Sequence, residues 1–154
     1  MSTVHPILVT GAAGRVGGVG GAVVEALRRR DLPVRALVHR EDERASTLRA
    51  TGAEVVVADL TRPGDVLRAL AGCKRMYFGM SVSAPYLEAT VATAASARQH
   101  GDLEVFVNMS QMTVSEMSLT ATTDSPQHRQ GWLAEQALNW SGLPVVHVRP
   151  TVFL

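Results

Sequence analysis

The sequence has few of the residues that build cross-links, metal centres or strongly charged surfaces. Among its 154 residues there is one cysteine, Cys73, which excludes an internal disulfide and a cysteine-based metal site. Lysine is equally scarce, since Lys74 stands alone against fourteen arginines. The formal net charge of +1 provides no bulk attraction to nucleic acid or to a membrane surface, so we expect neither as a partner.

Long hydrophobic runs are also missing. The first residues lack a basic segment followed by a long apolar one, so neither a signal peptide nor a membrane span is expected. His5, His39, His100 and His147 show no metal-ligand spacing, and no metal is expected. The lone cysteine suits a reducing compartment, which predicts a cytoplasmic protein. Frequent arginine and alanine are typical of a bacterial source with a GC-rich genome.

Short apolar runs alternate with helix-like stretches along the whole chain. Strands are expected at residues 7–10, 33–39, 53–60, 74–80, 103–110 and 143–150, and helices at 21–30, 41–52, 62–73, 85–101 and 124–142. Several strands are continuous apolar runs, which is typical of strands covered on both faces. The sequence therefore predicts a doubly wound parallel α/β sheet, Rossmann-like, with about six strands and helices on both faces.

Evenly spaced glycines separate the first strand from the first helix, at positions 11, 14, 17 and 20, with two more at 18 and 21. Glycine permits a tight turn and lets the backbone approach a pyrophosphate closely. The N-terminus of the following helix offers free N–H groups and a partial positive charge to the phosphates. This context predicts a dinucleotide-binding turn, with a merely structural glycine turn as the alternative.

The spacing Gly-x-x-Gly-x-x-Gly after "VT" resembles that of atypical short-chain dehydrogenase/reductases, in particular their NmrA-like branch. The matching stretches, in order, are "VRALVHR" (34–40), "ADL" (58–60), "AEQAL" (134–138), "SGLP" (141–144) and "VRP" (148–150). The resemblance implies an NAD(P)-binding Rossmann domain and an NADPH-dependent oxidoreductase. It also implies a substrate-binding region beyond residue 154, so we expect residues 1–154 to be a dinucleotide-binding domain without that C-terminal region.

Two glycine registers fit this resemblance. The pattern "TGAxGxxG" matches Thr10 to Gly17, whereas the junction with "GAVVEAL" fits only if Gly20 is the last glycine, which makes one extra triplet. Gly17 or Gly20 would then be the glycine at which the helix packs on the strand. Gly11, Ala13 and Gly14 are predicted to lie against the phosphates, because they leave the strand directly, and Arg15, Val16 and Gly17 are predicted to belong to the cofactor-binding turn.

The end of the second strand, "VHRED", bears on the choice of dinucleotide. An NAD site usually places an acid there to hold the ribose 2′-hydroxyl. Here His39 and Arg40 occupy the tip, and Glu41 and Asp42 follow. The donors of Arg40 suit a 2′-phosphate, which favours NADP(H). The nearby acids leave NAD open, and a solvated arginine is the alternative.

The resemblance assigns roles to further strand ends. Asp59 and Leu60 correspond to positions that contact adenine, although Asp59 could equally cap a turn. Gly79, Met80 and Ser81 correspond to the stretch along the ribose and nicotinamide. Ser110 ends the fifth strand where the superfamily commonly keeps a serine, although serine is also a common turn residue.

The chemistry most members of the superfamily use is missing. Their Tyr-x-x-x-Lys pair transfers a proton, and the matching positions here are Gln127 and Gly131, with no such pair elsewhere. We therefore predict no catalytic residue, and we interpret His128 as a surface histidine in preference to a proton donor. Trp132 and Trp140 are expected in the core or in a subunit contact of a homo-oligomer.

Three hypotheses stay open. The chain is an NAD(P)H-dependent oxidoreductase acting on a small molecule, a dinucleotide-binding redox sensor without catalysis, or a catalytically empty fragment. The fold alone does not separate an enzyme from a sensor.

Overall fold

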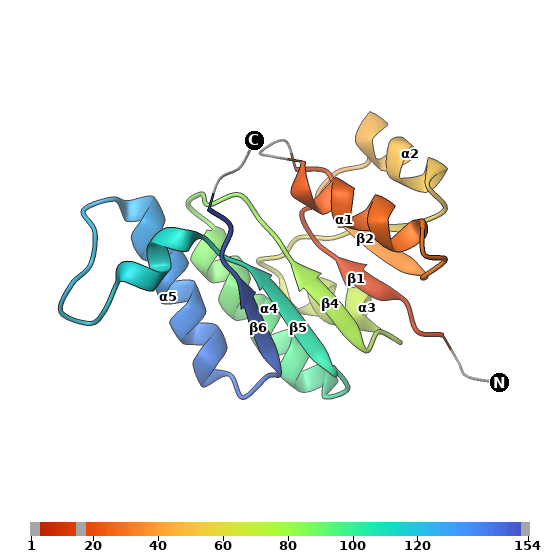
Figure 1. The fold of residues 1–154 in the computed structure, drawn as a ribbon. Helices are drawn as coiled ribbons and strands as arrows, with labels where there is room; N and C mark the ends of the chain where they lie inside the picture. Colours follow the sequence, from red (N-terminus) through yellow and green to blue (C-terminus); the bar gives the residue numbers. More distant parts are fainter. Residues whose placement is uncertain (1–3, 15–17, 152–154) are drawn as a thin grey trace.

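One sheet of six parallel strands forms the centre of the computed structural model, which describes residues 4–14 and 18–151 (Figure 1). The sheet order is β3-β2-β1-β4-β5-β6, and every neighbouring pair is parallel. This confirms the doubly wound parallel sheet. The strands are β1 (Ile7–Val9), β2 (Val34–Val38), β3 (Glu54–Val57), β4 (Arg75–Phe78), β5 (Val105–Met109) and β6 (Val145–Val148).

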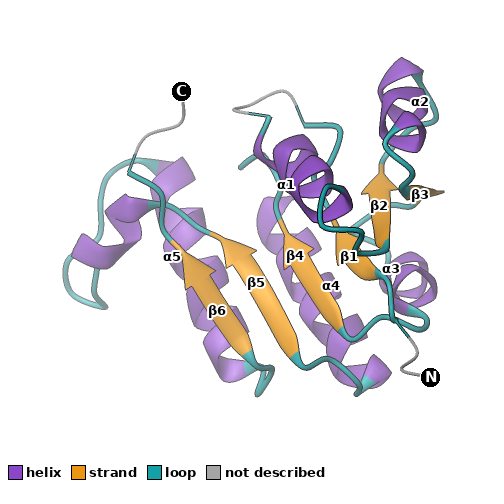
Figure 2. Cartoon of the chain, turned by 45° about the vertical axis from the view of Figure 1, so that its right-hand side comes forward, coloured by secondary structure: helices purple, strands orange, loops and turns teal. Residues whose placement is uncertain are grey.

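Helices cover both faces of the sheet, as the strand composition predicts. Helices α1 and α2 lie on one face, and α3, α4 and α5 lie on the other (Figures 1 and 2). Each expected helix is present, but the segment 111–126 also contains a short 3-10 helix, η1, that the sequence did not predict. The helices are α1 (Val19–Arg28), α2 (Glu43–Ala50), α3 (Pro63–Leu70), α4 (Tyr86–His100), α5 (Pro126–Trp140) and η1 (Met112–Glu116).

The two helical layers explain why the central strand β1 is apolar throughout. In β1, Leu8 packs into the core under α3, α4 and α5, whereas Ile7 and Val9 pack into the core under α1 and α2. All three side chains are buried. A strand with two covered faces has no solvent side, and alternation of polar and apolar residues disappears.

Of the two positions expected for Trp140, the structure excludes the core, because the exposed fraction of this residue is 77%, and the subunit contact stays a prediction. Val146 and Val148 on β6 are also exposed, because no described helix covers that face of the edge strand. Among the described residues, no helix combines the length and the hydropathy needed to cross a bilayer.

The chain reverses its direction of travel across the sheet between β1 and β4. From β1 it proceeds to β2 and β3 on one side, and from β4 it proceeds to β5 and β6 on the other. The connections that leave the carboxyl ends of β1 and β4 therefore diverge, and they leave a crevice between them. Such a switch point is where open α/β sheets bind ligands.

Candidate functional site

A buried threonine holds the two strand ends together at this crevice. Thr10 follows β1 directly and is fully buried. Its hydroxyl donates to the carbonyl oxygen of Gly79 at 2.9 Å and accepts from the Gly79 N–H at 3.0 Å. One side chain therefore satisfies both backbone groups of the residue that follows the end of β4. In the sequence, Thr10 is recognisable only as the first residue of the glycine pattern, and this role was not predicted.

The glycines of the β1–α1 turn are required by close backbone approaches. Gly11 has a φ of +66°, and a Cβ there would lie 2.4 Å from the Gly79 carbonyl oxygen. A Cβ on Gly20 would lie 2.3 Å from the Gly11 carbonyl oxygen and 2.9 Å from the Ala12 nitrogen. Gly20, in the first turn of α1, is therefore the glycine at which the helix meets the turn. Gly17, the other candidate, lies outside the described residues, as do Arg15 and Val16.

The N-terminus of α1 has no side-chain cap. Its N-cap is Gly18, in the left-handed conformation at φ 55°, and no acidic residue lies in the first helical turn. The first N–H groups of an α-helix have no partner within the helix. Together with the helix dipole, they make this end of α1 suited to a negatively charged group.

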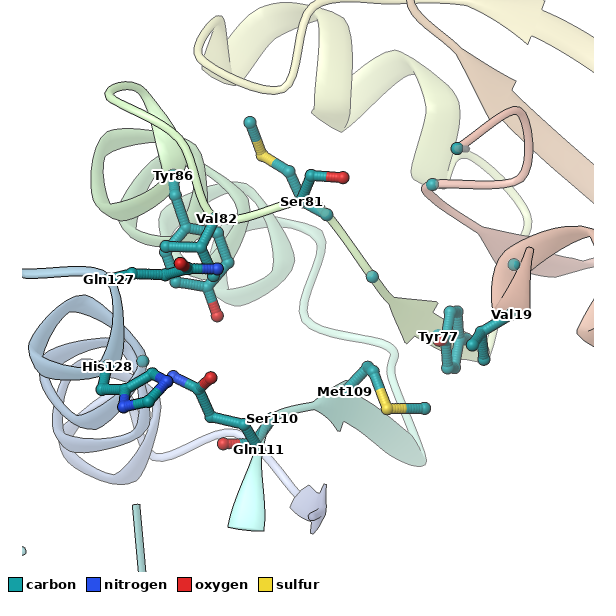
Figure 3. Close-up of a pocket in the computed structure, with 16 residues that line it drawn as sticks. Val19, Tyr77, Ser81, Val82, Tyr86, Met109, Ser110, Gln111, Gln127 and His128 are labelled. Carbon is teal, nitrogen blue, oxygen red and sulfur yellow. The ribbon is translucent and has the colours of Figure 1, made fainter. Parts of the chain in front are cut away.

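Two hollows meet at the glycine turn, with volumes of about 330 Å³ and 350 Å³. The first opens toward β5 and α5 (Figure 3) and the second toward β2 and β3. Among the predicted site residues, Gly11, Gly14, Gly79, Met80 and Ser81 line both hollows. Ser110 lines the first, and Ala13, Asp59 and Leu60 line the second. The fold thus gathers residues from distant parts of the sequence along one edge of the sheet.

The second hollow has apolar walls and one carboxylate, which caps a turn. Leu60 and Ala58 contribute apolar surface. Asp59 accepts from the Thr61 N–H at 2.9 Å and from the Thr61 hydroxyl at 2.7 Å, and these hydrogen bonds lower its pKa. Asp59 therefore caps the following turn and also lines the hollow. Arg40 is exposed and is not among the lining residues, whereas His39 is.

An arginine that was not among the predicted site residues lies beside the glycine turn. Arg44, in the first turn of α2, donates to the Ala13 carbonyl oxygen at 3.0 Å. Its guanidinium also binds Asp42 at 2.6 Å, and this pairing lowers the pKa of Asp42. Only the fold brings residue 44 next to residue 13, so no local sequence pattern could have indicated this contact.

The described lining of the first hollow consists of apolar and neutral polar side chains together with His128. Tyr86, at the start of α4, is buried, and this burial raises the pKa of its hydroxyl to about 12. Met109, Ser110 and Gln111 line the hollow from the end of β5 (Figure 3). No aspartate, glutamate, lysine or arginine is among its described lining residues.

A buried ion pair supports the wall of this hollow behind Ser110. Glu135 on α5 is 1% exposed, and both of its carboxylate oxygens accept from Arg149, at 3.0 and 2.6 Å. Burial alone would raise the pKa of Glu135, but Arg149 and the nearby Ser110 hydroxyl together lower it.

The two positions that correspond to the missing Tyr-Lys pair lie in the first hollow. Gln127 and Gly131 both line it from α5, and His128 lies beside them (Figure 3). The described residues contain no cluster of three or more histidine, cysteine, aspartate or glutamate side chains that could hold a metal. The arrangement can bind and orient a ligand, but it presents no tyrosine–lysine pair for proton transfer.

Solved structures with similar folds include three reductases or oxidoreductases. Triphenylmethane reductase from Citrobacter sp., complexed with NADP(H), is 22% identical with a TM-score of 0.75 over 95% of this chain and 49% of that chain. ChuY, an anaerobilin reductase from Escherichia coli O157:H7, is 23% identical with a TM-score of 0.77 over 94% and 72%. The NADPH-dependent quinone oxidoreductase QOR2 from Escherichia coli, complexed with NADPH, is 20% identical with a TM-score of 0.75 over 93% and 48%.

The chain spans about half the length of the triphenylmethane reductase and of QOR2. Identities this low establish a shared fold. A comparison with curated proteins finds no significant match. The family model described as NAD(P)H-binding matches residues 11–154, which is nearly the whole chain and includes the glycine turn. The chain therefore belongs to the NAD(P)H-binding family.

Proposed function

We propose that residues 1–154 form the dinucleotide-binding domain of an NADP(H)-dependent reductase. The observation that carries this proposal is the meeting of the two hollows at a glycine turn that leads into the uncapped N-terminus of α1. A dinucleotide is two nucleotides joined by a pyrophosphate, and the site has the corresponding three parts. The buried thiol of Cys73 is consistent with a cytoplasmic protein.

The residues present fit each part of the cofactor. A Cβ on Gly11 or Gly20 would collide with neighbouring backbone, so only glycine lets the turn, β4 and α1 approach this closely, and the N–H groups at the start of α1 are the donors that a pyrophosphate would use. The second hollow, with Ala58 and Leu60, suits adenosine, and the first, with Met80 and Ser110, suits the nicotinamide. When bound, the nicotinamide would donate or accept a hydride.

Charge pairing beside β2 supports NADP(H) over NAD. An acid that holds the ribose 2′-hydroxyl must have a free carboxylate. Here Asp42 is paired with Arg44, and Glu41 is paired with Arg49 at 2.7 Å. The Arg44 guanidinium lies beside Ala13, which lines the second hollow, and Arg40 is exposed nearby on the same turn. We therefore propose that Arg40 and Arg44 bind the 2′-phosphate together.

The described lining of the first hollow includes no aspartate, glutamate, lysine or arginine, which favours an uncharged acceptor, such as a quinone or another carbonyl compound. QOR2 and the triphenylmethane reductase, each solved with a phosphorylated nicotinamide dinucleotide, make such a reaction plausible for this fold. A redox sensor without catalysis is the second candidate, because Gln127 and Gly131 occupy the positions of the proton-transfer pair. Oxidation of bound NADPH by a panel of quinones would support the reductase, and tight binding without oxidation would support the sensor.

The test is a titration of the purified chain with NADPH and NADH, followed by the fluorescence of the reduced nicotinamide. Arg44→Ala removes charge-assisted hydrogen bonds of about 1.5–3 kcal/mol, so NADPH should bind at least about tenfold more weakly. NADH should lose much less, and the control Arg98→Ala on α4 should bind both like the wild type. Equal losses for NADPH and NADH in Arg44→Ala would contradict the assignment of the 2′-phosphate.

A further inference from the structure

A buried tyrosine on β4 lies beside the start of the glycine turn. Tyr77 is the Cα partner of Val9 on β1, and the N–H of Thr10 donates to the Tyr77 carbonyl oxygen at 3.0 Å. The Tyr77 side chain belongs to the same apolar cluster as Val9, and the residue is 7% exposed. Its backbone is therefore fixed next to the point at which the turn leaves β1.

The Tyr77 ring extends along its own strand toward the crevice. A Cβ on Gly79 would lie 2.8 Å from Cε1 of this ring and 3.0 Å from its hydroxyl oxygen. The ring therefore occupies the space that a side chain at position 79 would fill, at the carboxyl end of β4, and it lines the first hollow. Val19, the first residue of α1, packs against the same cluster and lies on the same side of this hollow (Figure 3).

The hydroxyl of Tyr77 has no partner that would explain why this position holds a tyrosine. Burial raises the pKa of Tyr77, and no hydrogen bond or charged group of a described residue contributes to this increase. The phenol is therefore protonated at neutral pH and can donate a hydrogen bond. A phenylalanine would fill the same apolar space without burying an unpaired polar group, which destabilises a protein. The hydroxyl thus points to a ligand that accepts a hydrogen bond.

The surroundings of the hydroxyl indicate that this ligand is an anion. Gly14 and Gly20 line the same hollow, and the α1 N-terminus beside them has no side-chain cap. Its N–H groups and the positive end of the helix dipole attract negative charge, and a hydrogen bond to a charged acceptor is stronger than one to a neutral acceptor. We propose that the Tyr77 hydroxyl binds a phosphate oxygen of the pyrophosphate, together with the N–H groups at the start of α1. This proposal rests on the proposed function and adds a binding residue from outside the glycine turn.

The experiment compares the wild type with two variants that each lose one phenol hydroxyl. Tyr77→Phe removes the proposed donor, and the control Tyr86→Phe removes the same group from the opposite side of the same hollow (Figure 3). Three probes separate the parts of the cofactor. The first, 2′-phospho-ADP-ribose, contains the pyrophosphate but no nicotinamide, the second, adenosine 2′-monophosphate, lacks the pyrophosphate, and the third is inorganic pyrophosphate alone. Calorimetry measures the first two affinities, ligand-observed phosphorus NMR measures the third, and urea unfolding shows that each variant is folded.

We expect Tyr77→Phe to bind 2′-phospho-ADP-ribose and inorganic pyrophosphate about tenfold more weakly, as for loss of a hydrogen bond to a charged group, and adenosine 2′-monophosphate less than about twofold more weakly. Tyr86→Phe should bind all three probes like the wild type. Unchanged affinity of Tyr77→Phe for 2′-phospho-ADP-ribose, an equal loss for adenosine 2′-monophosphate, or the same loss in Tyr86→Phe would overturn the proposal. Failure of 2′-phospho-ADP-ribose to bind the wild type would instead refute the proposed function. Inorganic pyrophosphate would then decide on Tyr77, and only weaker binding in Tyr77→Phe than in the wild type would support its role.

Discussion

Two adjacent glycines of α1 should respond in opposite ways to alanine. A Cβ on Gly20 would lie 2.3 Å from the Gly11 carbonyl oxygen and 2.6 Å from its carbon, both of them backbone atoms of the turn. A Cβ on Gly21 would meet nothing nearer than the Ala12 carbonyl oxygen at 3.4 Å, which is an ordinary contact. Gly20→Ala must therefore push the helix away from the turn, whereas Gly21→Ala needs no adjustment.

The size of the difference follows from two opposing effects. Overpacking a close contact costs about 1–3 kcal/mol, and alanine gains about 1 kcal/mol over glycine inside a helix. Gly20→Ala should lower the free energy of unfolding by up to about 2 kcal/mol, and Gly21→Ala should raise it by about 0.5–1 kcal/mol. The shift in Gly20→Ala also moves the turn amides, so we expect NADPH to bind about tenfold more weakly, a change of about 1.4 kcal/mol.

Urea unfolding at pH 7 measures the first quantity, and titration with NADPH measures the second. The slope of the unfolding free energy against urea should match the wild type in both variants, which shows that the same structure unfolds. If Gly20→Ala were as stable as Gly21→Ala and bound NADPH equally well, the helix would not meet the turn at Gly20, and the glycine register would be wrong.

Two further predictions concern buried polar groups. Thr10→Val leaves the N–H and carbonyl oxygen of Gly79 without their partner, so it should cost about 1–3 kcal/mol of unfolding free energy. Thr90→Val, which removes a hydroxyl bonded only within its own helix, should cost less by the same urea assay. Glu135→Gln should destabilise the protein at pH 7 by about 1–3 kcal/mol, because it breaks a buried ion pair with Arg149 whose arginine is partly solvated. Because folding lowers the pKa of Glu135, the ion pair stabilises the protein above the unfolded pKa of about 4.3, and this stabilisation is lost as the pH falls through the folded pKa. The difference in unfolding free energy between wild type and Glu135→Gln should therefore shrink in urea unfolding experiments from pH 7 to pH 3. A difference that stays constant over this range would contradict the ionic origin.

The sequence predicted the order and type of the strands and long helices, because each has a local cause. The side chains of Ile7, Leu8 and Val9 are buried on both faces of the sheet, and the three consecutive apolar residues in the sequence indicate this burial. Helix α4 ends at Gly101, whose φ of +75° favours glycine, and the glycine in the sequence therefore marks the end of the helix. The exposure of Trp140 was not predictable, because it depends on which surfaces the rest of the molecule covers.

The site was predicted where strand ends and glycines mark it, and missed where contacts join distant segments. The resemblance to short-chain dehydrogenase/reductases assigned Ser110 and Gly79 to the site, and both follow strands that end at the same edge of the sheet. Arg44 meets Ala13 only through the placement of α2, and Gln111 meets Gly131 only through the packing of α5. Neither pair has a spacing that a sequence pattern could detect. The roles of Arg15, Val16 and Gly17 in cofactor binding stay predictions.

The most direct test of the central claim is calorimetric titration of the folded chain with NADPH. We expect saturable binding of one NADPH per chain, and we expect 2′-phospho-ADP-ribose to compete with NADPH for the same site. Absence of any saturable heat up to millimolar NADPH, with the chain shown to be folded by its cooperative unfolding, would contradict the claim that the β1–α1 turn binds a dinucleotide.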